Sequence, residues 1–254
     1  MSILLSGDLH CNTDKEIFSI IKTELISKYG EEKYDEIKYH IILGDAGFLL
    51  FNNLIKEMYL YSTLKERPFP VLCVLGNHDP VLGIKNLPEV DIGIGNKVIL
   101  VKNENPFIAY LKRGISYSID GLKFLVLGGA LSVDKSFRIP EISWWKEEYW
   151  NKEEKKNLFR LLKKESSFDY VLSHTGPSRV NQIIHTSMKR KLFPFIFDEV
   201  ASFNEKIDGK IKCKQWFCGH WHVDQLYHCD NLNRDYQYLY RKTALLSNNE
   251  IEVL

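Results

Sequence analysis

The stretch Val71-Leu72-Cys73-Val74-Leu75-Gly76-Asn77-His78-Asp79 joins a short apolar run to a group of polar side chains. The apolar run has the composition of a buried strand, and Gly76 ends it. The side chains that follow are therefore expected at the carboxyl edge of a sheet, where open α/β folds bind their ligands. Asn77 offers a neutral oxygen to a metal ion, and His78 can carry a proton near neutral pH.

Four other segments repeat this order of an apolar run, a small residue and then ligand-type side chains. They are Gly7-Asp8-Leu9-His10, Gly44-Asp45, Ser173-His174 and Gly219-His220-Trp221-His222. Segments with apolar residues at helical spacing separate the first three strands, and one of them predicts a helix over residues 50–64. The resulting β-α-β-α-β order favours a parallel sheet with helical crossovers.

The rest of the chain predicts further strands in an α/β fold. Residues 80–105 are expected to be loop-rich with one strand at 97–101, and Asp120-Gly121 predicts a hairpin. Additional strands are expected at 170–172 and 214–218, and an antiparallel pair at 225–229 and 236–240. Residues 153–164 are expected to form an amphipathic helix.

Composition limits the class of protein. The chain has 254 residues and 44% apolar residues, which predicts one domain over 1–254. Its net charge of +1 gives no general electrostatic case for nucleic acid or an anionic membrane. No run approaches the roughly 20 apolar residues of a membrane span. The five cysteines lack CxxC spacing, which predicts reduced thiols in a cytosolic protein.

The side chains expected at the strand ends form a candidate ligand set. It consists of Asp8, His10, Asp45, Asn77, His174, His220 and His222. Two carboxylates, four imidazoles and one amide are more than one zinc ion needs, and they suit two ions that share a carboxylate. Such ions lie roughly 3.5–4 Å apart in two-metal enzymes of phosphoryl transfer.

Charge counting predicts the reaction. Two divalent ions carry four positive charges, of which Asp8, Asp45 and a bridging hydroxide would offset three. The residual positive charge suits a phosphate anion, and the hydroxide would be the attacking nucleophile. The leaving oxygen then needs a proton, which His78 is placed to donate. The sequence therefore predicts a metal-dependent phosphoesterase.

The five motifs, in their order between residues 7 and 222, resemble those of the calcineurin-like metallophosphoesterases. The resemblance implies a four-layer α/β/β/α sandwich of mixed β-sheets, with a dinuclear metal site at the strand ends and His78 as the catalytic histidine. By the family pattern the first ion takes Asp8, His10, Asp45 and His222, and the second takes Asp45, Asn77, His174 and His220. Manganese is the first expectation for both ions, with iron, zinc or nickel as alternatives.

One departure from the family concerns phosphate binding. Protein serine/threonine phosphatases of this superfamily carry Asp-Arg-Gly shortly after the second motif, whereas Ala46-Gly47-Phe48 follows here. Residues 131–149 resemble a segment of small bacterial and phage metallophosphoesterases and are expected to form an ordered loop over the site. Arg138 in this segment is predicted to contact the substrate phosphate, together with Asn77. A surface salt bridge is the alternative for Arg138.

Two weaker assignments accompany Arg138. Arg179 is a second candidate for the phosphate, with a salt bridge favoured over that role. Asp134 is expected to cap the loop, and a bond to a ligating group is the alternative. A phosphate dianion offers three terminal oxygens to metals and guanidinium, which favours a monoester of a phosphoprotein or a nucleotide. The alternatives are a phosphodiesterase or nuclease, and a catalytically inactive binding scaffold. The expected partner is a phosphate-ester substrate, with no membrane and no indicated nucleic acid.

Overall fold

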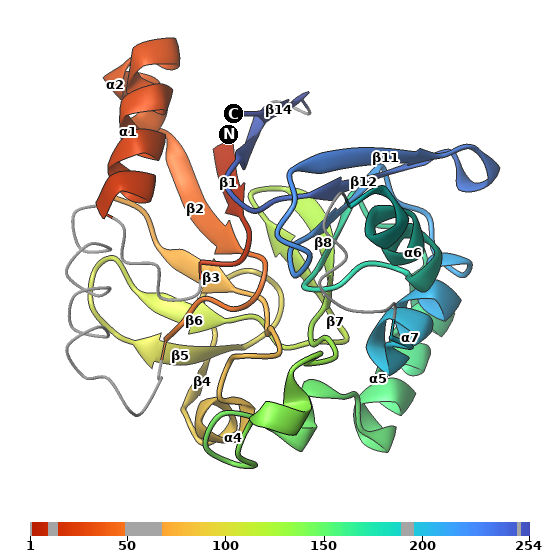
Figure 1. Cartoon of the computed structure of the whole chain (residues 1–254). Coiled ribbons are helices and arrows are strands. Elements are labelled where there is room, and N and C mark those ends of the chain that lie inside the picture. The colour runs from red at the N-terminus through yellow and green to blue at the C-terminus, as the bar shows by residue number, and fades with distance from the viewer. Residues whose placement is uncertain (1, 10–14, 49–67, 189–195, 248–249) are drawn as a thin grey trace.

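Two β-sheets lie face to face in the computed structural model, which describes residues 2–9, 15–48, 68–188, 196–247 and 250–254 (Figure 1). In the described residues, the first sheet has eight strands in the order β14 (Glu250–Val253), β13 (Thr243–Ser247), β1 (Ser2–Ser6), β2 (Ile37–Ile42), β3 (Val71–Cys73), β6 (Ile108–Tyr110), β5 (Val98–Lys102) and β4 (Glu89–Val90). The second has six described strands in the order β11 (Gln225–Cys229), β12 (Arg234–Tyr238), β10 (Gln215–Cys218), β9 (Tyr170–Ser173), β8 (Leu122–Leu127) and β7 (Ile115–Ile119).

The centre of the first sheet is parallel, as predicted. Ser6 pairs with Ile42, and Ile42 pairs with Cys73, so β1, β2 and β3 end at the same level. The first crossover contains α1 (Lys15–Tyr29) and α2 (Glu31–Asp35). The helix predicted over 50–64 lies outside the described residues. Because the three strands end together, the residues that follow them meet at one edge.

The second sheet is mixed. Its strands β8, β9, β10 and β12 run parallel, whereas β7 pairs antiparallel with β8 and β11 pairs antiparallel with β12. Asp120 and Gly121 have φ angles of 51° and 80°, the left-handed backbone that a tight hairpin turn requires. Both predicted antiparallel pairs are therefore confirmed.

The helices complete four layers, as the family resemblance implied. α1 and α2 cover the outer face of the first sheet through Leu25 and Tyr34. α5 (Lys152–Lys164), α6 (Ser178–Ser187) and α7 (Glu199–Asp208) cover the second sheet. Between the sheets, Leu5 and Leu72 share a buried cluster with Phe217. Within the described ranges, no helix has the length and apolar character that a membrane crossing demands.

Two regions differ in detail from the sequence expectations. Residues 80–105 contain α4 (Val81–Lys85) and β4 in addition to the predicted strand, and the three-residue strand β6 was not predicted. Residues 131–149 are irregular apart from two short 3₁₀ turns, η1 (Lys135–Phe137) and η2 (Lys146–Glu148). The described cysteines are all free thiols. That residues 1–254 form one domain stays a prediction.

Candidate metal centre

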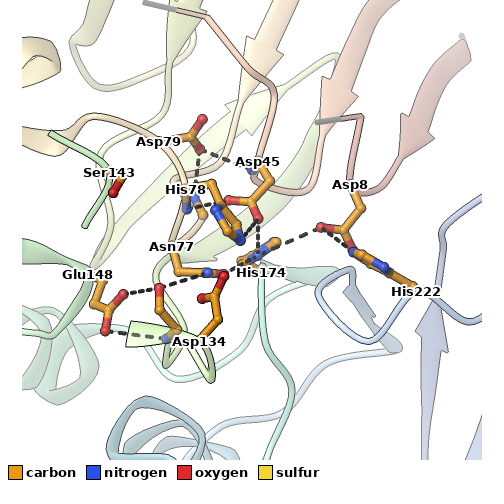
Figure 2. A network of polar contacts seen from close by, with 12 residues as sticks. Asp8, Asp45, Asn77, His78, Asp79, Asp134, Ser143, Glu148, His174 and His222 are labelled. Carbon is orange, nitrogen blue, oxygen red and sulfur yellow. Dashed lines mark hydrogen bonds and ion pairs between the residues drawn. The ribbon is translucent and has the colours of Figure 1, made fainter. Parts of the chain in front are cut away.

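The carboxyl ends of the two sheets bring together five of the predicted ligand side chains, Asp8, Asp45, Asn77, His174 and His222 (Figure 2). Asp8, Asp45 and Asn77 follow three parallel strands of the first sheet, while His174 follows β9 and His220 and His222 follow β10 of the second. His10 lies outside the described residues. The candidate centre is therefore built from both sheets, and its position depends on how they pack.

The closest group consists of Asp8, Asp45 and His174. One ligand atom of each lies within 4.8 Å of the others, and all three side chains are buried. The Nε2 atom of His174 is 3.3 Å from Oδ2 of Asp45 and 3.9 Å from Oδ1 of Asp8. His222 reaches the same carboxylate, with Nε2 4.0 Å from Oδ1 of Asp8. The rings of His174 and His220 have centroids 5.0 Å apart.

Strained backbone marks the same residues. Among the seven described non-glycine residues with positive φ are Asp8 at 43°, Asp45 at 51°, His220 at 70° and His222 at 51°. Residues other than glycine adopt this conformation uncommonly, with asparagine, aspartate and histidine the most frequent among them, and it persists where surrounding structure holds it in place. Each strand therefore turns abruptly after its last paired residue and directs a ligand side chain toward the centre.

Glycines in the motifs leave room for the ligands. A Cβ atom on Gly44 would lie 2.3 Å from Nδ1 of His174, and one on Gly76 would lie 2.0 Å from Oδ1 of Asp45. Contacts this short cannot be accommodated against groups that the sheet holds in place. The small residue between strand and ligand is thus required because two strand ends approach so closely.

His174 is oriented by a hydrogen bond on its far side. Its Nδ1 donates to the Leu43 carbonyl oxygen at 2.7 Å, which directs Nε2 toward the carboxylates. This arrangement is typical of metal-ligating histidines. Burial disfavours the imidazolium, but the carboxylates of Asp45 and Asp8 outweigh burial and raise the pKa of His174 to about 10. The centre is therefore strongly attractive to positive charge.

Burial has different effects on the other ligands. It raises the pKa of Asp8 to about 7, with Asp45 adding to the rise and His174 opposing it. It holds the pKa of His220 well below its usual range, with further lowering from His174, and it also lowers the pKa of His222. Two imidazoles are thus held neutral, which is the form that coordinates metal ions.

Asp79 connects the backbone before Asn77 to that of Asp45 through hydrogen bonds. Its Oδ2 accepts hydrogen bonds from the backbone of Gly76 at 2.7 Å and of Asp45 at 3.1 Å, and its Oδ1 accepts from the Tyr110 hydroxyl at 2.9 Å. Burial and the nearby Asp45 raise the pKa of Asp79 to about 6. Sequence reasoning assigned this residue no role of its own, although it belongs to the motif.

A chain of hydrogen bonds orients Asn77. Its Nδ2 donates to Ser132 Oγ at 3.1 Å, and Ser132 donates from Oγ to Oε2 of the fully buried Glu148 at 2.6 Å. The Ser132 backbone also donates to Oε1 of Glu148, at 3.3 Å. Because the amide nitrogen of Asn77 is engaged, its Oδ1 faces Nε2 of His174 at 3.0 Å. Sequence reasoning missed Glu148, and the only signal was its position among aromatic residues.

Arg138 lies beside His78. Its Nη2 donates to Nε2 of His78 at 3.3 Å, its Nε donates to Oδ1 of Asp134 at 2.6 Å, and its Nη1 donates to the Ser143 carbonyl at 2.8 Å. The same imidazole nitrogen is 3.7 Å from Oδ2 of Asp45. Arg138 thus forms the salt bridge that was the alternative and also reaches His78 beside the centre, while its contact with a phosphate stays a prediction.

The two weaker assignments have different outcomes, since the cap expected of Asp134 is wrong whereas Arg179 takes the favoured salt bridge. Asp134 makes no side-chain capping hydrogen bond and instead pairs with Arg138, which outweighs burial and lowers the pKa of Asp134. Arg179 pairs with Glu205 and Asp208 at the packing of α6 against α7. Its guanidinium is engaged by these acids because α6 begins next to them.

The residues present fit a metal centre. Buried carboxylates and an imidazole converge, a hydrogen bond orients His174, and glycines keep the space between the strand ends open. The donor set of oxygen and nitrogen atoms suits divalent transition metals. The described residues alone bring Asp8, Asp45 and His174 within reach of one ion.

Comparison with known proteins agrees with this geometry. The family model described as calcineurin-like phosphoesterase matches residues 1–224. One solved structure superposes with a TM-score of 0.61 at 10% identity, covering 100% of this chain and 98% of the other. The structure of TT1561 from Thermus thermophilus superposes with a TM-score of 0.52 at 15% identity, covering 100% and 97%. At these identities the two structures show the fold alone. The search of curated proteins found no match.

Proposed function

The chain belongs to the calcineurin-like phosphoesterase family, and from that premise we propose that this metal-dependent phosphoesterase hydrolyses a phosphate monoester at the metal centre. The observation that carries the proposal is the position of Arg138 and His78 at the rim of the cluster of Asp8, Asp45 and His174. A cationic donor and an imidazole thus lie beside a cation-binding group.

Six described side chains would hold two divalent ions, with His10 as the seventh ligand of the family pattern. They are Asp8, Asp45, Asn77, His174, His220 and His222. When bound, such ions lower the pKa of a water molecule and offset the negative charge of a phosphate. Manganese is the metal that we expect first.

Arg138 and His78 would act on the substrate directly. A phosphate oxygen near Nη2 of Arg138 and Nε2 of His78 can accept hydrogen bonds from both groups, whose nitrogens are 3.3 Å apart. In the absence of phosphate, Arg138 can only donate, so Nε2 of His78 accepts. A bound phosphate dianion would accept the hydrogen bond that Nη2 of Arg138 otherwise donates to His78. Its negative charge would favour a proton on Nε2 of His78. That proton can then pass to the leaving oxygen.

The charge at the centre favours a monoester over a diester. A monoester dianion presents three terminal oxygens, which suits the metal ions together with the guanidinium of Arg138. Phosphoproteins and nucleotides are the substrate classes expected from the sequence. The cytosol stays the compartment predicted from the cysteines.

The test compares p-nitrophenyl phosphate with bis(p-nitrophenyl) phosphate. Purified protein loaded with manganese should hydrolyse the monoester faster, and a chelator should stop the reaction. Faster hydrolysis of the diester would assign a phosphodiesterase. No hydrolysis of either ester with manganese, iron, zinc, nickel or cobalt would favour the inactive scaffold.

A further inference from the structure

The connection between β12 and β13 lies beside the metal centre. It comprises residues 239–242 and carries the chain from the second sheet to the first. The Leu239 backbone donates to the Cys218 carbonyl at 2.9 Å, and the Leu239 carbonyl oxygen occupies the space that a Cβ atom on Gly7 would need. The connection therefore contacts the ends of β10 and β1, from which two of the ligand motifs begin.

Asp224 fixes the shape of this connection. Its carboxylate oxygens accept hydrogen bonds at 2.8–3.2 Å from three successive backbone N–H groups, those of Tyr240, Arg241 and Lys242. Successive N–H groups of a turn form a site for an anion, which here is the carboxylate. Asp224 follows His222 by two residues, so the carboxylate ties the segment that carries this candidate ligand to the connection.

Tyr240 places its ring against the imidazole of His222. The ring centroids lie 4.6 Å apart, and the ring planes are nearly parallel at 8°. Figure 2 shows His222 beside Asp8, whose Oδ1 is 4.0 Å from Nε2 of the imidazole. The His222 side chain is 48% exposed, and its backbone φ is 51°. The stack therefore restrains an exposed ring on a strained backbone, in an orientation that faces a carboxylate of the centre.

We infer that Tyr240 is a positioning residue, which holds the imidazole of His222 in the orientation that binds a metal ion. This role rests on the proposed function, in which His222 is one of the metal ligands. A ring that is already held in place loses little conformational freedom when the ion binds, so the affinity for the ion increases. A coordinated imidazole also carries part of the positive charge of the ion, and the face of a tyrosine ring attracts such charge.

The experiment measures manganese binding to the metal-free protein by titration calorimetry. Tyr240→Leu removes the stack and keeps an apolar side chain. We expect the affinity for one of the two ions to fall about two- to tenfold, the range for one aromatic pair, and the affinity for the other ion to stay unchanged. Saturating manganese should restore kcat for p-nitrophenyl phosphate, because the chemistry itself does not involve Tyr240.

Two further substitutions separate orientation of His222 from general packing. Tyr240→Phe keeps the ring and should retain the affinity for both ions. Tyr227→Leu removes a half-buried tyrosine of β11 that contacts Tyr238 edge-on, and it is the matched control. Both ions should bind to this control as tightly as to the unchanged protein. Thermal unfolding of each metal-free variant verifies that it is folded.

Asp224→Ala tests whether the connection holds Tyr240 in place. Loss of the carboxylate releases three backbone N–H groups, so the turn should loosen and the stack should weaken. We expect the affinity for the same ion to fall as in Tyr240→Leu. Asp224→Asn keeps an oxygen that can accept these hydrogen bonds and should lose less affinity.

His222→Ala distinguishes failure of this inference from failure of the proposed function. The variant should lose one ion. If it does, and Tyr240→Leu still binds both ions with unchanged affinity, the inference is overturned and the proposed function stands. Equal weakening of both ions in Tyr240→Leu, or a loss in Tyr240→Phe as large as in Tyr240→Leu, would also overturn it. If His222→Ala binds both ions with unchanged affinity, His222 is not a ligand, and both proposals fail at this residue.

Discussion

The cluster of Asp8, Asp45 and His174 and the segment 131–149 border the same reaction centre but are built in opposite ways. The cluster is buried and follows directly from strand ends whose backbone is strained at Asp8 and Asp45. The segment is irregular, buries Ser132 and Glu148, and exposes both charged and apolar side chains elsewhere. One region is fixed by the sheets, whereas the other is fixed by side-chain hydrogen bonds.

This difference separates two kinds of contribution. Changes in the cluster should affect every substrate, because its ligands serve the metal ions. Changes in the segment should affect the orientation of Asn77, the binding of phosphate or the choice among substrates. The segment is tied to the residues that follow β3, because Ser132 accepts a hydrogen bond from Asn77 and Arg138 donates one to His78.

The largest effect is expected for Asp45→Asn. The substitution keeps the shape of the side chain but removes the charge that both ions are expected to share. We expect loss of bound metal and a fall in kcat of more than about 10⁴-fold, beyond what one general acid supplies. Metal analysis of the purified variant, with circular dichroism to verify folding, provides the measurement. Full metal content would contradict a bridging role for Asp45.

His78→Asn should have the next largest effect. The variant should retain its metal and lose about 10²–10⁴-fold in kcat for esters with poor leaving groups, the range for one general acid. The loss should be smaller for p-nitrophenyl phosphate, whose leaving group needs no proton. An equal loss across leaving groups would assign His78 to binding of the phosphate charge.

The two regions also differ in how far the sequence predicts them. Asp45 follows an apolar run and a glycine, and local sequence is enough to place it at a strand end. Its strained backbone and the close approach of Gly76 could not be foreseen, since both depend on the packing of neighbouring strands. The parallel pairing of β1, β2 and β3 was predictable for the same local reason.

Glu148 shows why the segment was less predictable. It lies 16 residues from Ser132, and Ser132 lies 55 residues from Asn77, so no local spacing connects them. Their contact depends on the path of an irregular segment. The length and composition of the segment predicted an ordered loop over the site. The hydrogen bonds that hold this loop in place could be identified only in the structure.

The substitution Glu148→Gln tests whether the segment orients a metal ligand. Ser132 now donates to Glu148 and accepts from Asn77. A glutamine amide can donate to Ser132 instead, which would turn the hydroxyl toward Asn77 and favour a flipped Asn77 amide with its nitrogen facing the ions. We expect metal affinity to fall by about 10–100-fold, the usual effect of losing such an outer partner.

The measurement is activity as a function of manganese concentration. Saturating manganese should restore most of kcat in Glu148→Gln, which a general loss of stability would not allow. Glu147→Gln changes the neighbouring, partly exposed carboxylate and is the matched control. An unchanged manganese requirement in Glu148→Gln would show that Ser132 alone orients Asn77.

The smallest effect is expected for Arg138→Ala, because this side chain serves the phosphate and not the metals. A charge-assisted hydrogen bond is worth about 1.5–3 kcal/mol when buried, and partial exposure of Arg138 favours the lower value. We therefore expect kcat/KM to fall roughly tenfold, with metal content unchanged. Arg160→Ala on α5, which removes an exposed guanidinium, is the control. If kcat/KM does not change, Arg138 serves only its ion pair with Asp134, and phosphate selection rests on the cluster alone.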